Sequence, residues 1–231
     1  PGLYISRVHH RRCIGHVSPK TAERKYQKAK EYLVEKTRYE AIEGDWDVEF
    51  CPKLLPSFEM TLEKLVDFST SDDERIKYFS GTAVYRNKFT VSKKQLAGKK
   101  RFLLDLGRVN DIVEVRINGE HSVVLWYPPY QADVTDYIHE GENHIELHVT
   151  NNWANRLIGD EQYPADFEWG DDRGERGHAM KSFPDWFLKN QERPEKNRIG
   201  FSIWYYHRKD SSLQPAGLCG PVRLVERYLD N

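Results

Sequence analysis

The sequence predicts an all-β fold, a β-sandwich or barrel of antiparallel strands. After Trp46, apolar side chains alternate with polar ones in many short runs, and this period of two is typical of half-buried strands. Turn residues separate the runs, and no long helical pattern lies between them. A chain of 231 residues can hold one large β-type domain, or one domain with an appendage.

The alternating residues place the predicted strands. They are Trp46, Val48 and Phe50; Tyr85 to Val91 in part; Phe102, Leu104 and Leu106; Val113, Val115 and Ile117; Ile145, Leu147 and Val149; and Val222 and Leu224. Asn118-Gly119 predicts a two-residue hairpin, because a type I′ turn needs positive φ at both central positions. Further turn signals are Gly107, Pro128-Pro129, residues 141–143 and residues 217–221.

A basic segment precedes the strands. Residues 1–44 hold ten Lys and Arg against five acids, a local charge of +5, whereas the whole chain has a net charge of -1. Ser18-Pro19 is typical of a helix start, and Tyr26, Ala29 and Leu33 recur at helical spacing. We therefore predict an amphipathic helix that extends to about Tyr39, within an N-terminal segment 1–44 that precedes a sandwich at 45–231.

A long insertion interrupts the sandwich pattern between Asn151 and Arg198. It contains three of the six tryptophans, several glycines and prolines, and many charges of both signs. A loop of this length in a compact domain is usually functional or disordered, and its aromatic content argues against disorder.

Composition excludes some classes of function. No apolar run approaches the ~20 residues of a membrane-spanning helix, so no membrane insertion is expected. Lys and Arg number 35 against 36 acids, which disfavours a dedicated nucleic-acid-binding protein. Three cysteines are too few for a disulfide framework. The first 30 residues lack the apolar core of a signal peptide, and the chain begins at Pro1, so we expect a processed product or part of something longer.

Aromatic and planar polar side chains occur together in the insertion. Sugar rings have apolar C–H faces and a rim of hydroxyls, so a sugar site needs an aromatic platform with amide, carboxylate and guanidinium groups around it. Trp153, with the asparagines and acids around it, has this composition, as do Trp169 and Trp186. The alternative is that these tryptophans anchor the insertion on the sheet as a small core.

Other chemistry has weaker support. Asp160/Glu161, Asp166/Glu168 and Asp171/Asp172 could supply the two carboxylates of a glycoside hydrolase, but adjacency in sequence does not place two groups across a substrate. His9, His10, Cys13 and His16 match no standard zinc spacing. Phosphate-binding glycine loops and a G-x-S-x-G nucleophile motif are absent from the sequence.

Six segments in order resemble a known domain: YFSGTAVY, LDLGRV, VEVRINGE, LWYPPYQADVT, GENHIELHVTNNWANRLIGDEQYP and LQPAGLCGPVRL. Together they resemble the galactose-binding-like jelly roll of glycoside hydrolases. The resemblance covers about Trp46 to Glu226. It extends to the sugar-binding domain of family 2 and, more closely, to the C-terminal β-sandwich of bacterial family 106 α-L-rhamnosidases.

This resemblance implies a jelly-roll β-sandwich that binds an oligo- or polysaccharide and is non-catalytic by itself. The catalytic carboxylates of those enzymes lie in a separate (β/α)-barrel, a possible partner here that needs roughly 250 residues. It also implies a possible structural calcium, which no acidic motif places, and a periplasmic or secreted location. The candidate ligand-binding residues are Asn151, Asn152, Trp153, Asn155, Arg156, Asp160, Glu161, Trp169 and Trp186.

Two alternatives to sugar binding stay open. The insertion could dock on a catalytic barrel, in which case the isolated chain exposes a sizeable apolar patch. Alternatively, the chain is itself a hydrolase that uses carboxylates of the insertion, which requires one acid with a raised pKa beside an ionised one.

Overall fold

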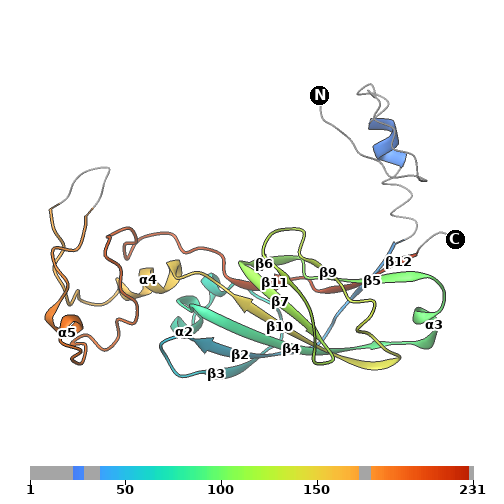
Figure 1. The fold of residues 1–231 in the computed structure, drawn as a ribbon, viewed down its shortest axis with the longest axis horizontal. Coiled ribbons are helices and arrows are strands. Elements are labelled where there is room, and N and C mark those ends of the chain that lie inside the picture. The colour runs from blue at the N-terminus through green and yellow to red at the C-terminus, as the bar shows by residue number, and fades with distance from the viewer. Residues whose placement is uncertain (1–22, 29–36, 172–177, 229–231) are drawn as a thin grey trace. The chain divides into compact units, whose positions relative to one another are not determined.

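A computed structural model describes residues 23–28, 37–171 and 178–228 (Figure 1). The chain divides into two units, Pro1–Arg38 and Tyr39–Asn231. Of the first unit, residues 23–28 are helical, which agrees with part of the predicted helix. The second unit contains the β-sandwich.

Six strands form the larger sheet of the sandwich, in the order β3-β2-β4-β10-β7-β8. Their bounds are β3 (Phe58–Leu62), β2 (Trp46–Pro52), β4 (Gly81–Val91), β10 (Gly141–Thr150), β7 (Ile112–Ile117) and β8 (Glu120–Leu125). All five pairings are antiparallel. Asn118 and Gly119 join β7 to β8 with φ of 54° and 82°, so the predicted hairpin is confirmed.

The second layer is a four-stranded sheet in the order β1-β12-β5-β9. Its strands are β1 (Thr37–Ala41), β12 (Arg223–Tyr228), β5 (Lys100–Asp105) and β9 (Gln131–Asp133). A short pair, β11 (Gly217–Gly220) with β6 (Arg108–Asn110), completes the strands. The predicted all-β sandwich is confirmed.

The core consists of the inward-facing residues that the alternation predicted. Val48 and Phe50 on β2, Leu104 on β5 and Leu147 on β10 are all buried. Phe50 stacks on Phe58 with ring centroids 4.7 Å apart. Burial of this apolar surface is the main force that holds the two layers together.

Short helices lie in the connections between strands. They are η1 (Phe68–Thr70), α2 (Glu74–Lys77), α3 (Lys93–Leu96), α4 (Ala154–Asp160) and α5 (Asp185–Leu188). The predicted insertion therefore contains two short helices, and regular strand structure resumes only at β11. In Figure 1 this segment, with α4 in gold and α5 in orange, extends beyond the end of β10. None of the described helices is both long and apolar enough to cross a membrane.

The N-terminal prediction needs one correction. Residues 37–41 form strand β1 and not the end of a helix, and Ile42 lies in the core. The predicted helix reached Tyr39 because Tyr26, Ala29 and Leu33 have helical spacing, but this spacing does not continue to Thr37. Pairing with β12, a contact distant in sequence, decides the structure here. The sheet thus begins before residue 44, the predicted end of the N-terminal segment.

Candidate functional site

The register of the larger sheet gathers three chain segments at one end. Thr150, the last residue of β10, lies opposite Ile112, the first residue of β7. Leu125, the last residue of β8, lies opposite Val113. Asp111 and Trp126 are adjacent to these strand ends and Asn152 lies two residues after Thr150, so the three residues come together at the end of the sheet from which the insertion leaves.

A polar cluster, Asp111, Asn152 and Gln214, forms at this end. Asp111 Oδ2 accepts hydrogen bonds from Asn152 N at 3.1 Å and Asn152 Nδ2 at 3.0 Å. Asn152 Nδ2 also donates to Gln214 Oε1 at 3.2 Å. Within the described part of the chain, these bonds use only one of the two Asp111 carboxylate oxygens. The cluster therefore offers a carboxylate oxygen and an amide group to a ligand hydroxyl.

Trp153 follows the cluster directly and is partly exposed. Its side chain is 39% exposed. One edge of the indole ring lies close to Gly200: a Cβ atom added at Gly200 would be 3.7 Å from Trp153 Cε3. One ring surface is thus supported by the chain while another stays open to solvent.

Two of the predicted asparagines are bonded to the backbone. Asn151 Nδ2 donates to Phe79 O at 2.8 Å, and its Oδ1 accepts from Gly81 N at 3.0 Å. Asn155 is buried and makes the same double contact with the backbone N and O of Gln214, at 2.8 and 2.7 Å. These amides join the start of the insertion to the sandwich and to the returning chain.

Arg156 and Asp160 also face the interior. Asp160 is 1% exposed and accepts hydrogen bonds from the backbone N–H groups of Ile199, at 3.0 Å, and Gly200. The Arg156 guanidinium lies one helical turn away, with Nε 3.0 Å from Asp160 Oδ1. The pair closes the insertion on itself, so Asp160 has no exposed surface with which to contact a sugar.

Two further arginine–carboxylate pairs hold the insertion. Arg198 Nη2 donates to Glu161 Oε1 at 2.5 Å, and Arg193 Nε donates to Asp166 Oδ2 at 2.6 Å. Both guanidinium groups are largely buried. Buried charges of this kind are stable only when they are paired, so Glu161 serves the structure of the insertion.

Trp169 and Trp186, the other two tryptophans predicted to bind sugar, pack against neighbouring aromatic rings. Trp169 contacts Phe167 and Tyr205, with ring centroids 4.8 and 5.0 Å away. Trp186 donates from Nε1 to Asp166 O at 3.1 Å and packs against Phe201. The alternative interpretation, in which these tryptophans form a small core of the insertion, therefore describes the surroundings of these two rings.

A recess lies between Trp169, Asp160, Glu161, Trp204 and His207. It has room for about one water molecule, which is too small for a sugar ring. Burial lowers the pKa of His207 below its ordinary value.

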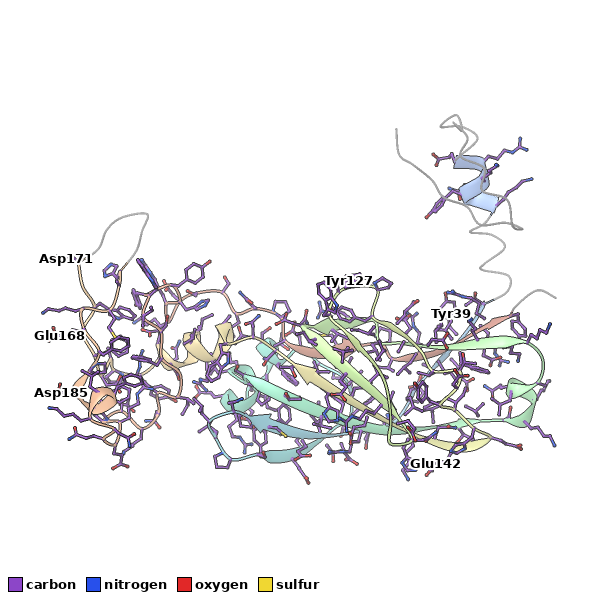
Figure 2. The ribbon with its side chains drawn as sticks, viewed as in Figure 1. Tyr39, Tyr127, Glu142, Glu168, Asp171 and Asp185 are labelled. Atoms are coloured by element: carbon purple, nitrogen blue, oxygen red, sulfur yellow. The ribbon has the colours of Figure 1, made fainter. Side chains whose placement is uncertain are left out.

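Sequence reasoning missed one exposed aromatic pair. Trp126 and Tyr127, in the loop between β8 and β9, are 69% and 60% exposed, and their rings meet edge to face with centroids 4.9 Å apart. Figure 2 labels Tyr127 at the tip of this loop. Pro128-Pro129 predicted a turn there, and the two aromatic residues directly before these prolines were the signal that could have found the exposed pair.

A second missed feature is a charged groove on the outer face of the larger sheet. Its volume is about 520 Å³, within the usual range for small-molecule sites. Arg86, Arg116 and Glu146 lie in its lining, and Arg86 Nε is 2.9 Å from Glu146 Oε2. The described lining residues include no Trp, Tyr or Phe, so the groove has no large aromatic platform for stacking a sugar.

Metal ligands are the last class of candidate. Within residues 23–28, 37–171 and 178–228, no three His, Cys, Asp or Glu side chains gather as a metal site. The calcium suggested by the resemblance stays an unplaced prediction. His9, His10, Cys13 and His16 lie outside the described residues, as does Asp172.

Comparisons with known proteins agree with the fold. Residues 62–207 match the family described as "Glycosyl hydrolase 2 galactose-binding domain-like". A curated protein of Formosa agariphila, named "Putative beta-glucuronidase", is 44% identical over 189 residues, which are 80% of this chain and 16% of that protein. The solved rhamnosidase of Novosphingobium sp. PP1Y has a TM-score of 0.64 and 32% identity, over 83% of this chain and 15% of the rhamnosidase.

A β-glucuronidase of Ruminococcus gnavus shares the fold, with a TM-score of 0.51 and 14% identity over 84% of this chain and 30% of that one. The chain thus spans less than a third of each of these relatives. The family match covers more than half of the chain, and the two-layered sandwich is the fold it requires. The chain belongs to the glycosyl hydrolase 2 galactose-binding domain-like family.

Proposed function

We propose that this chain is a carbohydrate-binding accessory domain of a glycoside hydrolase of α-L-rhamnosidase type, and that it is non-catalytic by itself. The observation that carries this proposal is the exposed Trp153 ring beside the polar cluster of Asp111, Asn152 and Gln214. The 32% identity to the Novosphingobium rhamnosidase supports the choice of enzyme type.

The arrangement suits a sugar for chemical reasons. An exposed indole face packs against the C–H groups of a pyranose ring, and carboxylate and amide groups beside it bond the ring hydroxyls. Of the nine residues predicted from sequence, Asn152 and Trp153 are the two that the described structure leaves both exposed and adjacent. We therefore assign sugar contact to these two residues and a supporting role to the others.

The state of the acids in the insertion supports a non-catalytic role. Glycoside hydrolysis needs one carboxylic acid with a raised pKa and a second, ionised carboxylate across the substrate. Asp160, Glu161 and Asp166 are each bonded to a largely buried arginine. Lys181, which donates to Glu168 at 2.9 Å, holds the pKa of that exposed carboxyl below its ordinary value.

Calorimetric titration of the 231-residue chain with L-rhamnose, D-glucuronic acid and rhamno-oligosaccharides tests the proposal. We expect binding without turnover of aryl α-L-rhamnoside, and a loss of about tenfold or more in affinity for Trp153→Ala. Tyr206→Ala, which removes another exposed ring, is the matched control and should bind as the unchanged chain does. Turnover that disappears on replacement of Glu168 would instead make the chain a hydrolase.

A second candidate function has its own observation. Phe183, Phe187 and Leu188, at and beside α5, expose about half or more of their surface, and we call them the α5 face. Exposed apolar groups of this kind often mark protein interfaces. They favour docking of the insertion on the catalytic barrel of a longer enzyme. The match covers only 15% of the Novosphingobium rhamnosidase, so that enzyme is long enough to hold such a barrel.

The docking function is tested with the Novosphingobium rhamnosidase produced without its matching domain. We expect the chain to bind this protein, and Phe187→Asp to weaken the complex while leaving sugar affinity unchanged. The absence of binding by the unchanged chain would contradict docking.

A further inference from the structure

We propose that the loop of Trp126 and Tyr127 is a second stacking platform of the same site, and that the ligand is a neutral saccharide of two or more units. This inference rests on the proposed carbohydrate-binding function, and it adds a binding element on the far side of the polar cluster from Trp153.

Strand register places the loop beside the cluster. Leu125 lies opposite Val113, so the chain that leaves β8 at Trp126 and the chain that enters β7 at Asp111 occupy the same end of one hairpin. Tyr130 Oη donates to Asp111 O at 2.9 Å, which ties the far side of the loop to the same residue. Asp111 is thus bonded to Asn152 on one side and to the aromatic loop on the other.

The loop is held in place at its C-terminal side. Leu106 N donates to Tyr130 O at 2.9 Å, and Gln131 begins strand β9, which pairs with β5. At its other side the loop continues from β8. Rings that are exposed yet carried by an anchored loop lose little conformational entropy when a ligand binds, so they suit a binding platform.

The strand order points to a ligand with more than one ring. Trp153 follows β10 and Trp126 follows β8, and β7 lies between these strands in the sheet. The polar cluster sits at the start of β7. A single pyranose that stacks on one tryptophan therefore leaves the other free, whereas a chain of sugars can cover both and place hydroxyls on Asp111.

The charge of the cluster favours a neutral sugar. Asp111 keeps one carboxylate oxygen outside the described hydrogen bonds, and a carboxylate accepts from hydroxyls but repels a second carboxylate. The guanidinium of Arg156, four residues after Asn152 in the chain, is paired with Asp160 in the interior. A neutral sugar chain fits this cluster better than a uronic acid chain.

Titration with L-rhamnose, rhamno-oligosaccharides of two to four units and glucuronate tests this inference. We expect affinity to rise from the monosaccharide to the oligosaccharides and to be weakest for glucuronate. Trp126→Ala should weaken oligosaccharide binding by about tenfold, Trp126→Phe should retain most of the affinity, and Tyr206→Ala should have no effect. Circular dichroism of each variant verifies that the sandwich is folded.

The outcomes separate the two proposals. If the unchanged chain binds oligosaccharides and Trp153→Ala weakens them but Trp126→Ala does not, the second platform is wrong while the proposed function holds. Equal affinity for rhamnose and its oligosaccharides, or a preference for glucuronate, also overturns the inference. If the unchanged chain binds no saccharide, the proposed function itself fails.

Discussion

The sandwich and the insertion are stabilised by different forces. The sandwich buries a continuous set of apolar side chains between two sheets, and the aromatic rings of Phe50, Phe68 and Phe79 meet in its interior. The insertion has few buried aliphatic residues and is held by arginine–carboxylate pairs. Ion pairs can hold a loop in place even when some of its aromatic side chains are not buried. The insertion can therefore leave aromatic surface exposed for a ligand or a partner.

The largest effect is expected in the sandwich. Phe50 is fully buried and contacts three other aromatic rings, so Phe50→Ala leaves a cavity that the surrounding strands cannot fill. We expect a loss of about 3–5 kcal/mol in the free energy of unfolding. The denaturant midpoint, monitored by fluorescence, measures it. A loss below about 1 kcal/mol would mean that the core is loosely packed.

A smaller and local effect is expected in the insertion. Asp160→Asn removes the charge that faces Arg156 and one of the acceptors for the backbone N–H groups of Ile199 and Gly200. We expect about 1–3 kcal/mol of local destabilisation. Hydrogen exchange should accelerate in residues 196–201 and stay unchanged in β4 and β10. Equal acceleration in those strands would show that the insertion and the sandwich unfold as one unit.

The smallest effect concerns the outer face of the larger sheet and depends on pH. Burial raises the pKa of Glu146, but hydrogen bonds from His148 and Arg86 outweigh burial and hold the pKa below its ordinary value of 4.5. A carboxylate with a lowered pKa stabilises the folded state above pH 4.5, and this stabilisation is lost as the pH falls through the folded-state pKa.

Glu146→Gln should therefore lose about 0.5–1 kcal/mol at pH 7 and show a flatter decline in stability between about pH 5 and pH 3. Urea denaturation across this range measures both quantities. Glu63→Gln, a change at an exposed loop position, is the control. An unchanged acid profile in the Glu146 variant would show that the ion pairs of this face contribute nothing to stability.

Much of the fold could be predicted from sequence because the core strands alternate strictly. The alternating sets at Trp46, Phe102, Val113, Ile145 and Val222 correspond to β2, β5, β7, β10 and β12. Strands β1, β3, β6, β8, β9 and β11 escaped prediction. They lie at or near sheet edges, where one face is solvated and the apolar alternation is weak.

The candidate site was predictable only in part. Asn152 and Trp153 could be found because an aromatic residue follows polar ones at the end of a strong strand. Asp111, Gln214 and Trp126 could not be assigned to the same place, because 41 and 62 residues separate Asn152 from Asp111 and Gln214. Sequence also cannot distinguish a buried, arginine-paired Asp160 from a solvated acid.

The sequence by itself determined the all-β class, the hairpin at Asn118-Gly119 and the family resemblance, because each depends on local patterns of side chains and turns. Only the tertiary structure decided which polar residues of the insertion are buried in ion pairs and which face solvent. It alone brought the ends of β7, β8 and β10 together. The physical reason is that burial and charge pairing depend on contacts between segments distant in sequence, which no local pattern records.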